Sequence, residues 1–178
     1  MTTPLLGGAF DPPHNGHVAL AAAVRERFGE PVILVTADPG HKATAASAAD
    51  RLALARAAFP DFRVELDPHA RTIDLLRAGR FPDPLVVIGA DEYADLPAWT
   101  EPEEVLRLAR LAVATRPGFS VDGKVDQFAI EPVPIASRDV RTRVAAGDPI
   151  DGLVPPAVAE LIRVRGLYVA SGGYTRGS

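Results

Sequence analysis

Short apolar runs alternate with helix-like segments along most of this 178-residue sequence. Runs such as residues 31–36 and 84–88 are apolar at nearly every position, which indicates strands buried on both faces. Between the runs, apolar residues recur three or four positions apart, as in helices that cover a sheet. Parallel strands need long crossovers, so this alternation favours a parallel sheet with helices on both faces. The sequence therefore predicts an α/β, doubly wound, Rossmann-like fold.

The expected elements follow one another regularly. We expect about five strands, at residues 4–8, 31–36, 62–66, 84–88 and 111–115. We expect helices at residues 15–28, 48–59, 72–78 and 102–108, and a C-terminal helical segment made of residues 139–146 and 156–165. Residues 127–133 read either as one more strand or as an extended edge. The chain is then a single domain over residues 1–170, followed by a disordered tail at 171–178.

The composition excludes several classes of protein. The absence of cysteine rules out disulfides and thiolate chemistry and argues against a zinc site. No signal peptide is recognisable, and no apolar run approaches the roughly 18–20 residues that span a bilayer. We therefore expect a cytoplasmic protein without a membrane partner. The net charge of −4 argues against a nucleic-acid partner. The sequence leaves the oligomeric state open and is compatible with a homo-oligomer.

One stretch near the N-terminus, L-L-G-G-A-F-D-P-P-H-N-G-H, suggests an anion site. Gly7 and Gly8 lack a Cβ, so a polyanion can approach the backbone N–H groups there. Asn15 is a suitable N-cap for a helix whose N-terminus would attract negative charge. His14 and His17 would then lie in the loop and the first turn, where both imidazoles can face the anion. The alternative is a tight turn with two solvated histidines.

Further polar residues follow the expected strands. In doubly wound sheets, ligands bind beyond the carboxyl ends of the strands, at the point where the strand order reverses. Gly89 and Asp91 follow the fourth strand, where the carboxylate could accept hydrogen bonds from a ribose. Cationic residues that could concentrate positive charge near strand ends or helix starts are Lys42, Arg116, Arg138, Arg141 and Arg143. Each of these segments could instead be an ordinary solvated turn.

The first motif resembles the G-G-x-F-D-P-x-H-x-G-H signature of the nucleotidylyltransferase superfamily. Four further segments resemble bacterial nicotinate-nucleotide adenylyltransferases: P-G-H-K at 39–42, G-A-D-x-x-x-x-L-x-x-W at 89–99, R-P-G at 116–118, and I-A-S-R-D-V-R at 135–141. The last segment departs from the family's I-S-S-T-x-I-R, because Ala136 replaces a Ser and Arg138 replaces a Thr. The resemblance covers most of the chain, from Leu5 to Tyr168.

The resemblance implies adenylyl transfer from ATP to nicotinate mononucleotide, with Mg²⁺ bound to the ATP. It implies catalytic roles for His14, His17, Lys42 and Arg141, with no protein ligands set aside for a metal ion. The residues implied to bind ATP are Gly7, Gly8, Ala9, Phe10, His14, His17, Gly89, Asp91, Arg116, Ile135, Ser137, Arg138 and Arg141. The residues implied to bind the pyridine mononucleotide acceptor are Lys42, Thr72, Trp99 and Thr100. A single tryptophan is otherwise more often a core anchor than a ligand platform.

One segment departs more strongly from the family. Where the family carries S-Y-T-x-x-T-L, this chain reads A-R-T-I-D-L-L at residues 70–76: Thr72 is kept, but the Ser, the Tyr and the second Thr are replaced. An alternative is therefore the same reaction with another acceptor, such as nicotinamide mononucleotide or a specialised phosphorylated metabolite. A second alternative is a nucleotide-binding protein that does not catalyse, motivated by Ala136 and Arg138. Intact His14, His17 and Lys42 argue against it.

Overall fold

A parallel sheet forms the centre of the molecule. The computed structural model describes residues 1–40, 43–123 and 125–170. The six strands are β1 (Thr3–Gly8), β2 (Val32–Thr36), β3 (Arg63–Asp67), β4 (Pro84–Gly89), β5 (Arg110–Thr115) and β6 (Asp126–Ala129). All neighbouring strands pair in parallel, in the order β3-β2-β1-β4-β5-β6. This order reverses between β1 and β4, which confirms the doubly wound, Rossmann-like fold.

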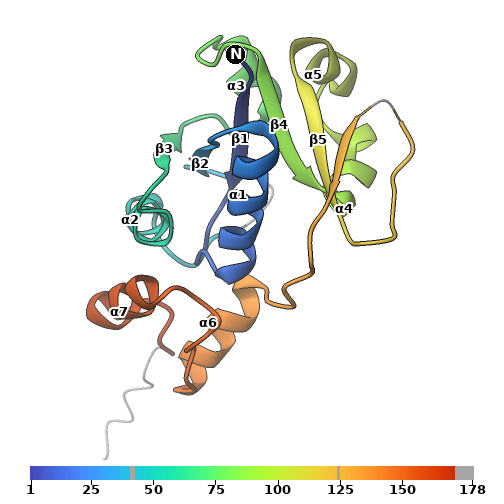
Figure 1. Ribbon diagram of the computed structural model, residues 1–178. Coiled ribbons are helices and arrows are strands. Elements are labelled where there is room, and N and C mark those ends of the chain that lie inside the picture. Colours follow the sequence, from blue (N-terminus) through green and yellow to red (C-terminus); the bar gives the residue numbers. More distant parts are fainter. Residues whose placement is uncertain (41–42, 124, 171–178) are drawn as a thin grey trace, which may run out of the picture.

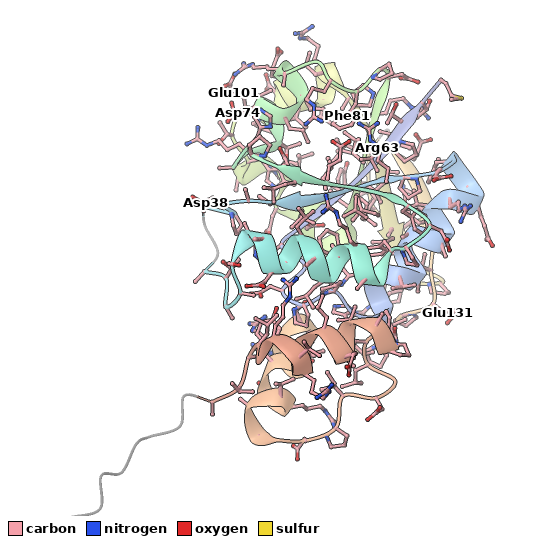
Figure 2. All side chains as sticks on the ribbon, turned by 90° about the vertical axis from the view of Figure 1, so that its left-hand side faces the viewer. Asp38, Arg63, Asp74, Phe81, Glu101 and Glu131 are labelled. Atoms are coloured by element: carbon pink, nitrogen blue, oxygen red, sulfur yellow. The ribbon has the colours of Figure 1, made fainter. Side chains whose placement is uncertain are left out.

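Helices cover both faces of the sheet (Figure 1). The helices are α1 (Asn15–Phe28), α2 (Ala48–Ala58), α3 (Thr72–Arg77), α4 (Ala90–Ala94), the 3₁₀ turn η1 (Leu96–Ala98), α5 (Pro102–Leu108), α6 (Ser137–Ala146) and α7 (Pro156–Arg165). Figure 1 shows α6 and α7 beyond the end of the sheet at which the strands terminate, next to the start of α1. Figure 2 shows α7 running alongside α2, with which it is in contact.

The core divides into two layers because successive residues of a strand point to opposite faces. On one face, Leu6 of β1 and Ile33 of β2 pack with α1, α2, α6 and α7. On the other face, Val86 and Ile88 of β4 pack with α3, η1 and α5. Leu5 belongs to a third, smaller cluster against α3. Burial on both faces is the reason why these strands are apolar without alternation.

The structure differs from the expected elements in a few places. The sheet has six strands, not about five, because residues 126–129 pair along the exposed side of β5. Between the fourth strand and the helix at 102–108, where no element was expected, the structure has α4 and η1. Helix α6 begins two residues earlier than expected, at Ser137. The expected disordered tail, residues 171–178, lies outside the described residues. In the described part of the chain, no helix is both long and apolar enough to cross a membrane.

Candidate active site

The glycine pair lies at the end of β1, beside the point where the strand order reverses. A Cβ built on Gly7 would have no described atom within 4 Å, so the backbone there is open to a ligand. A Cβ on Gly8 would lie 3.2 Å from the ring of Phe10, which leaves little room for a side chain. Phe10 itself is buried, and its ring packs edge-on against His17 at a centroid distance of 5.1 Å. Ala9 is half-buried.

The two histidines cap helix α1. Nδ1 of His14 accepts the N–H of Gly16 at 3.1 Å, and Nδ1 of His17 accepts the backbone N–H of His14 at 3.1 Å. The prediction that Asn15 caps this helix was wrong, because the imidazole of His14 supplies the acceptor one position earlier. Asn15 instead donates from its side chain to the carbonyl of Gly152 at 2.8 Å. The imidazoles of His14 and His17 thus accept two N–H groups that a helix terminus leaves without partners.

Gly16 lies between the histidines for a steric reason. A Cβ on this residue would lie 2.9 Å from Cε1 of His14, closer than real side chains approach one another. The two imidazoles lie face to face at a slight tilt, with centroids 3.8 Å apart. Only a residue without a side chain at position 16 leaves the His14 ring in place. The glycine of the H-x-G-H motif is therefore required by the position of the His14 ring.

His14 is held in its neutral form. Burial lowers its pKa from the usual 6.5 to about 4, and the nearby carboxylate of Asp139 only partly opposes this shift. Because Nδ1 accepts a hydrogen bond, a neutral His14 carries its proton on Nε2. The same argument places an Nε2 proton on a neutral His17. Both side chains are thus arranged to donate from Nε2.

Helix α6 is bonded to the turn between β1 and α1, residues 9–14, which we call the motif turn. The hydroxyl of Ser137 donates to the carbonyl of Pro12 at 2.8 Å. Arg141 donates from Nη1 to the carbonyl of Asp11 at 2.7 Å. The Asp11–Pro12 peptide bond between these two acceptors is cis. Residues 135–141 therefore meet the first motif in space, although about 125 residues separate them in the sequence.

The remaining candidates for ATP binding lie outside the motif turn and the α1 cap. Gly89 precedes α4, and its N–H donates to Glu92 at 3.1 Å. Asp91 is exposed in the first turn of α4. Arg116 is exposed directly after β5, and Arg138 is exposed in the first turn of α6, whereas Ile135 is half-buried against the core. Lys42 lies outside the described residues.

Of the described candidate acceptor residues, Thr72 begins α3, and Trp99 packs on the face covered by α3 and α5. Trp99 is half-buried and packs against the cluster that contains Ile73 of α3. Thr72 is half-buried at the start of α3, and Thr100 is exposed. A two-bond ion pair from Arg77 of α3 to Glu101, with the shorter bond at 2.6 Å, joins α3 to the segment that follows Trp99.

The structure separates the family-pattern replacements at residues 70–76 into a buried position and two exposed positions. Leu75, which replaces the family's second Thr, is buried in the core with Leu5, Leu34 and Phe81. A buried leucine there concerns packing and does not line a ligand site. Ala70 and Arg71 are exposed before α3 and remain the differences that could alter an acceptor site.

The sequence analysis missed three residues in or next to the motif turn: Arg51, Asp11 and Tyr168. Arg51 is 1% exposed, and its guanidinium bonds four backbone carbonyls at the ends of β1 and β2 and before α2. The buried carboxylate of Asp11 accepts the hydroxyl of Tyr168 at 2.8 Å. An Arg within the apolar repeat of an expected helix was the available signal for Arg51. Asp11 lay inside the first motif and Tyr168 at the last residue that the family resemblance covers, but nothing in the sequence paired them.

The described residues contain no group of three or more His, Asp or Glu side chains that could hold a metal ion. The donors that surround the motif turn are imidazole, guanidinium, hydroxyl and backbone N–H groups. Such donors bind anions, and hard cations prefer oxygen ligands. The region is therefore suited to phosphate groups.

Comparisons with known proteins agree with this geometry. A family model described as cytidylyltransferase-like matches residues 5–143. Relatives named "Probable nicotinate-nucleotide adenylyltransferase" include those of Chlorobaculum parvum, 32% identical over 94% of this chain and 99% of the relative, and of Roseiflexus castenholzii, 35% identical over 93% and 97%. A relative of the same name from an Arthrobacter species is 36% identical over 92% and 89%.

Solved structures show the same fold. A Plasmodium falciparum nicotinic acid mononucleotide adenylyltransferase complexed with NaAD superposes with a TM-score of 0.78, and the same enzyme complexed with APC with 0.75. Both are 16% identical to this chain and cover 94% of it. The match covers 97% of the chain in the NaAD complex and 96% of the chain in the APC complex. At this identity the likeness supports the fold alone. With the family model over most of the chain and full-length relatives above 30% identity, this chain belongs to the cytidylyltransferase-like family, among its nicotinate-nucleotide adenylyltransferases.

Proposed function

We propose that this protein transfers the adenylyl group of ATP to nicotinate mononucleotide, which yields nicotinate adenine dinucleotide and pyrophosphate in NAD biosynthesis. The observation that carries the proposal is the histidine pair at the start of α1, fixed by its two capping bonds and by Gly16. The names of the full-length relatives support the choice of both substrates.

The acceptor phosphate is the nucleophile of the proposed reaction. Its second pKa is near 6, so it is mostly dianionic at pH 7 and requires no general base. One of its oxygens attacks the α-phosphorus of ATP in line, while the bond from that phosphorus to the bridging oxygen of the β-phosphate breaks. Pyrophosphate leaves with the electron pair of that bond. The protein has to align two polyanions and to stabilise the negative charge that develops.

We assign these tasks to residues around the motif turn. Nε2–H of His14 and of His17 would donate to triphosphate oxygens, with His17 acting chiefly on the charge of the transition state. Arg141 would add positive charge behind the motif turn, and Lys42 would contact the phosphates from the connection after β2. ATP would enter as its Mg²⁺ complex, with the ion held by phosphate oxygens. Trp99 would stack near the pyridine ring of the acceptor.

The test is pyrophosphate release from MgATP across a panel of acceptors. Nicotinate mononucleotide, nicotinamide mononucleotide and phosphopantetheine are compared, with CTP as an alternative donor. We expect ATP with nicotinate mononucleotide to turn over fastest by a wide margin. Fast turnover with another acceptor would instead support the alternative suggested by exposed Ala70 and Arg71. ATP binding without any turnover would contradict a catalytic role.

A further inference from the structure

A buried polar network connects the motif turn to both ends of the connection between β2 and α2. Arg51 of α2 donates from Nη1 to the carbonyls of Ala9 at 2.9 Å and Thr36 at 2.7 Å. It also donates from Nη2 to the carbonyl of Ala37 at 2.8 Å and from Nε to that of Ala46 at 3.2 Å. One side chain therefore joins the chain after β1, the chain after β2 and the residue that precedes the N-cap of α2.

Asp11 makes the complementary bonds from the motif turn. Its carboxylate is 5% exposed and accepts the N–H groups of Ala45 at 2.6 Å and Ala46 at 3.1 Å. The hydroxyl of Tyr168, which follows α7, donates to the same carboxylate at 2.8 Å. Burial and the bond to Asp11 raise the pKa of Tyr168 well above its ordinary value, so the phenol stays protonated as a donor. The peptide groups at Ala46 are thus bonded on both sides, to Asp11 and to Arg51.

An apolar side chain at position 51 could fill the space but could not bond the four carbonyls that Arg51 bonds. The bonds are directional, so they specify where the bonded segments lie as well as contributing to stability. All four acceptors of Arg51 are backbone carbonyls at the carboxyl edge of the sheet or at the start of α2. The network therefore bonds that edge of the sheet to the start of α2.

We propose that Arg51, Asp11 and Tyr168 form one positioning unit for the transfer reaction. The unit fixes the motif turn, and with it His14, relative to the carboxyl end of β2. This inference rests on the proposed function, in which the rate comes from aligning two polyanions. A small displacement of the turn then lowers kcat, while the interactions that bind ATP in the ground state persist.

The variants Arg51→Met, Arg51→Lys, Asp11→Asn and Tyr168→Phe test the unit. Arg56→Met is the matched control for Arg51, because Arg56 is exposed on the same helix. Tyr93→Phe is the control for Tyr168, because its hydroxyl bonds the carbonyl of Asp122 outside the network. The readouts are kcat per folded molecule and KM for ATP.

We expect Arg51→Met and Asp11→Asn to lower kcat by about tenfold or more with KM for ATP within about threefold of wild type. Arg51→Lys should be intermediate, since an ammonium group cannot reach four separated carbonyls. Tyr168→Phe removes one hydroxyl from a half-buried ring and should fold, with kcat lowered about threefold or more. A kcat per folded molecule equal to wild type in Tyr168→Phe would overturn the proposal, even if the other variants do not fold.

A double-variant cycle tests whether the residues act as one unit. If they do, kcat of Arg51→Lys combined with Tyr168→Phe falls by less than the product of the two single losses. Losses that multiply would show independent effects and would overturn the single unit. Each kcat in this comparison is taken per folded molecule, so that differences in folded fraction are removed before the losses are compared.

Amide hydrogen exchange separates this inference from the proposed function. We expect the N–H groups of Ala45 and Ala46 to exchange faster in Tyr168→Phe and Arg51→Lys, with the N–H of Ile33 in β2 unchanged. Equally faster exchange at Ile33 would show a general loss of stability and would overturn the positioning role. Absence of turnover in the wild-type protein would refute the proposed function, and the exchange pattern would still test the network.

Discussion

The nucleotide side and the acceptor side of the candidate site differ in how their residues are held. On the nucleotide side, hydrogen bonds to the motif turn or within the α1 cap fix His14, His17, Ser137 and Arg141. On the acceptor side, Thr72, Trp99 and Thr100 make no side-chain hydrogen bond to any described residue, and Trp99 is held by apolar packing.

The difference suggests a division of tasks. Backbone bonds fix the groups that would handle the triphosphate, which is the same for every acceptor. The acceptor side consists of half-buried and exposed positions, where a substitution such as Arg71 changes the surface without changing the core. Under the proposed assignment, substitutions on the acceptor side would alter acceptor specificity and leave the groups that handle the triphosphate in place.

The largest expected effect concerns His17 on the nucleotide side. We expect His17→Ala to lower kcat by more than about 100-fold with a modest change in KM, because it removes a donor that acts on the transition-state charge. Steady-state pyrophosphate release measures both constants. Thermal unfolding provides the control, since the α1 cap is also lost. An unchanged kcat would remove His17 from the proposed mechanism and the basis of the comparison above.

The second prediction concerns pH and His14. Its folded pKa of about 4 lies below its usual 6.5, so the unfolded chain binds more protons between these values. The stability contributed by neutral His14 is present above pH 6.5 and is lost as the pH falls through 4, by about 3 kcal/mol in total. Denaturant unfolding across this range measures the loss. His14→Asn, which keeps a capping side chain without a titrating group, should flatten the profile. Equal slopes in both proteins would show that His14 is not buried in its neutral form.

The third prediction concerns the acceptor side. Trp99→Ala should raise KM for nicotinate mononucleotide about tenfold and leave KM for ATP unchanged, because stacking on an aromatic side chain contributes about 1–3 kcal/mol per base. Phe119→Ala is the control, since Phe119 is exposed in the segment after β5. Equal rises in both KM values would mean that the two sides are not separate.

The smallest expected effect concerns Arg138, an exposed charge on α6. We expect Arg138→Ala to raise KM for ATP about threefold at low salt, with the difference fading as salt screens the interaction. Arg163→Ala, another exposed arginine paired with Glu160 on α7, is the matched control. A difference from wild type that persists at high salt would show a direct bond to the nucleotide instead of a long-range charge effect.

Much of the fold could be predicted because the strands are buried on both faces. Uninterrupted apolar runs such as those of β2 and β4, alternating with helix-like segments, indicate strands of a parallel sheet that is covered on both faces. The edge strand β6 was harder to assign, because an edge has one neighbour and a weaker apolar pattern. Similarly, α4 is only five residues long and exposes most of its surface, so its sequence lacks a helical apolar repeat.

The sequence by itself determined the fold class, the strand ends at which polar residues gather and the motif with the two histidines. These properties depend on local spacing and on residue type. Only the tertiary structure decided that His14 caps α1, that Leu75 belongs to the core and that Arg51, Asp11 and Tyr168 meet. Contacts between residues as far apart as Asp11 and Tyr168 depend on how the whole chain packs. Short-range sequence patterns carry no record of such pairings.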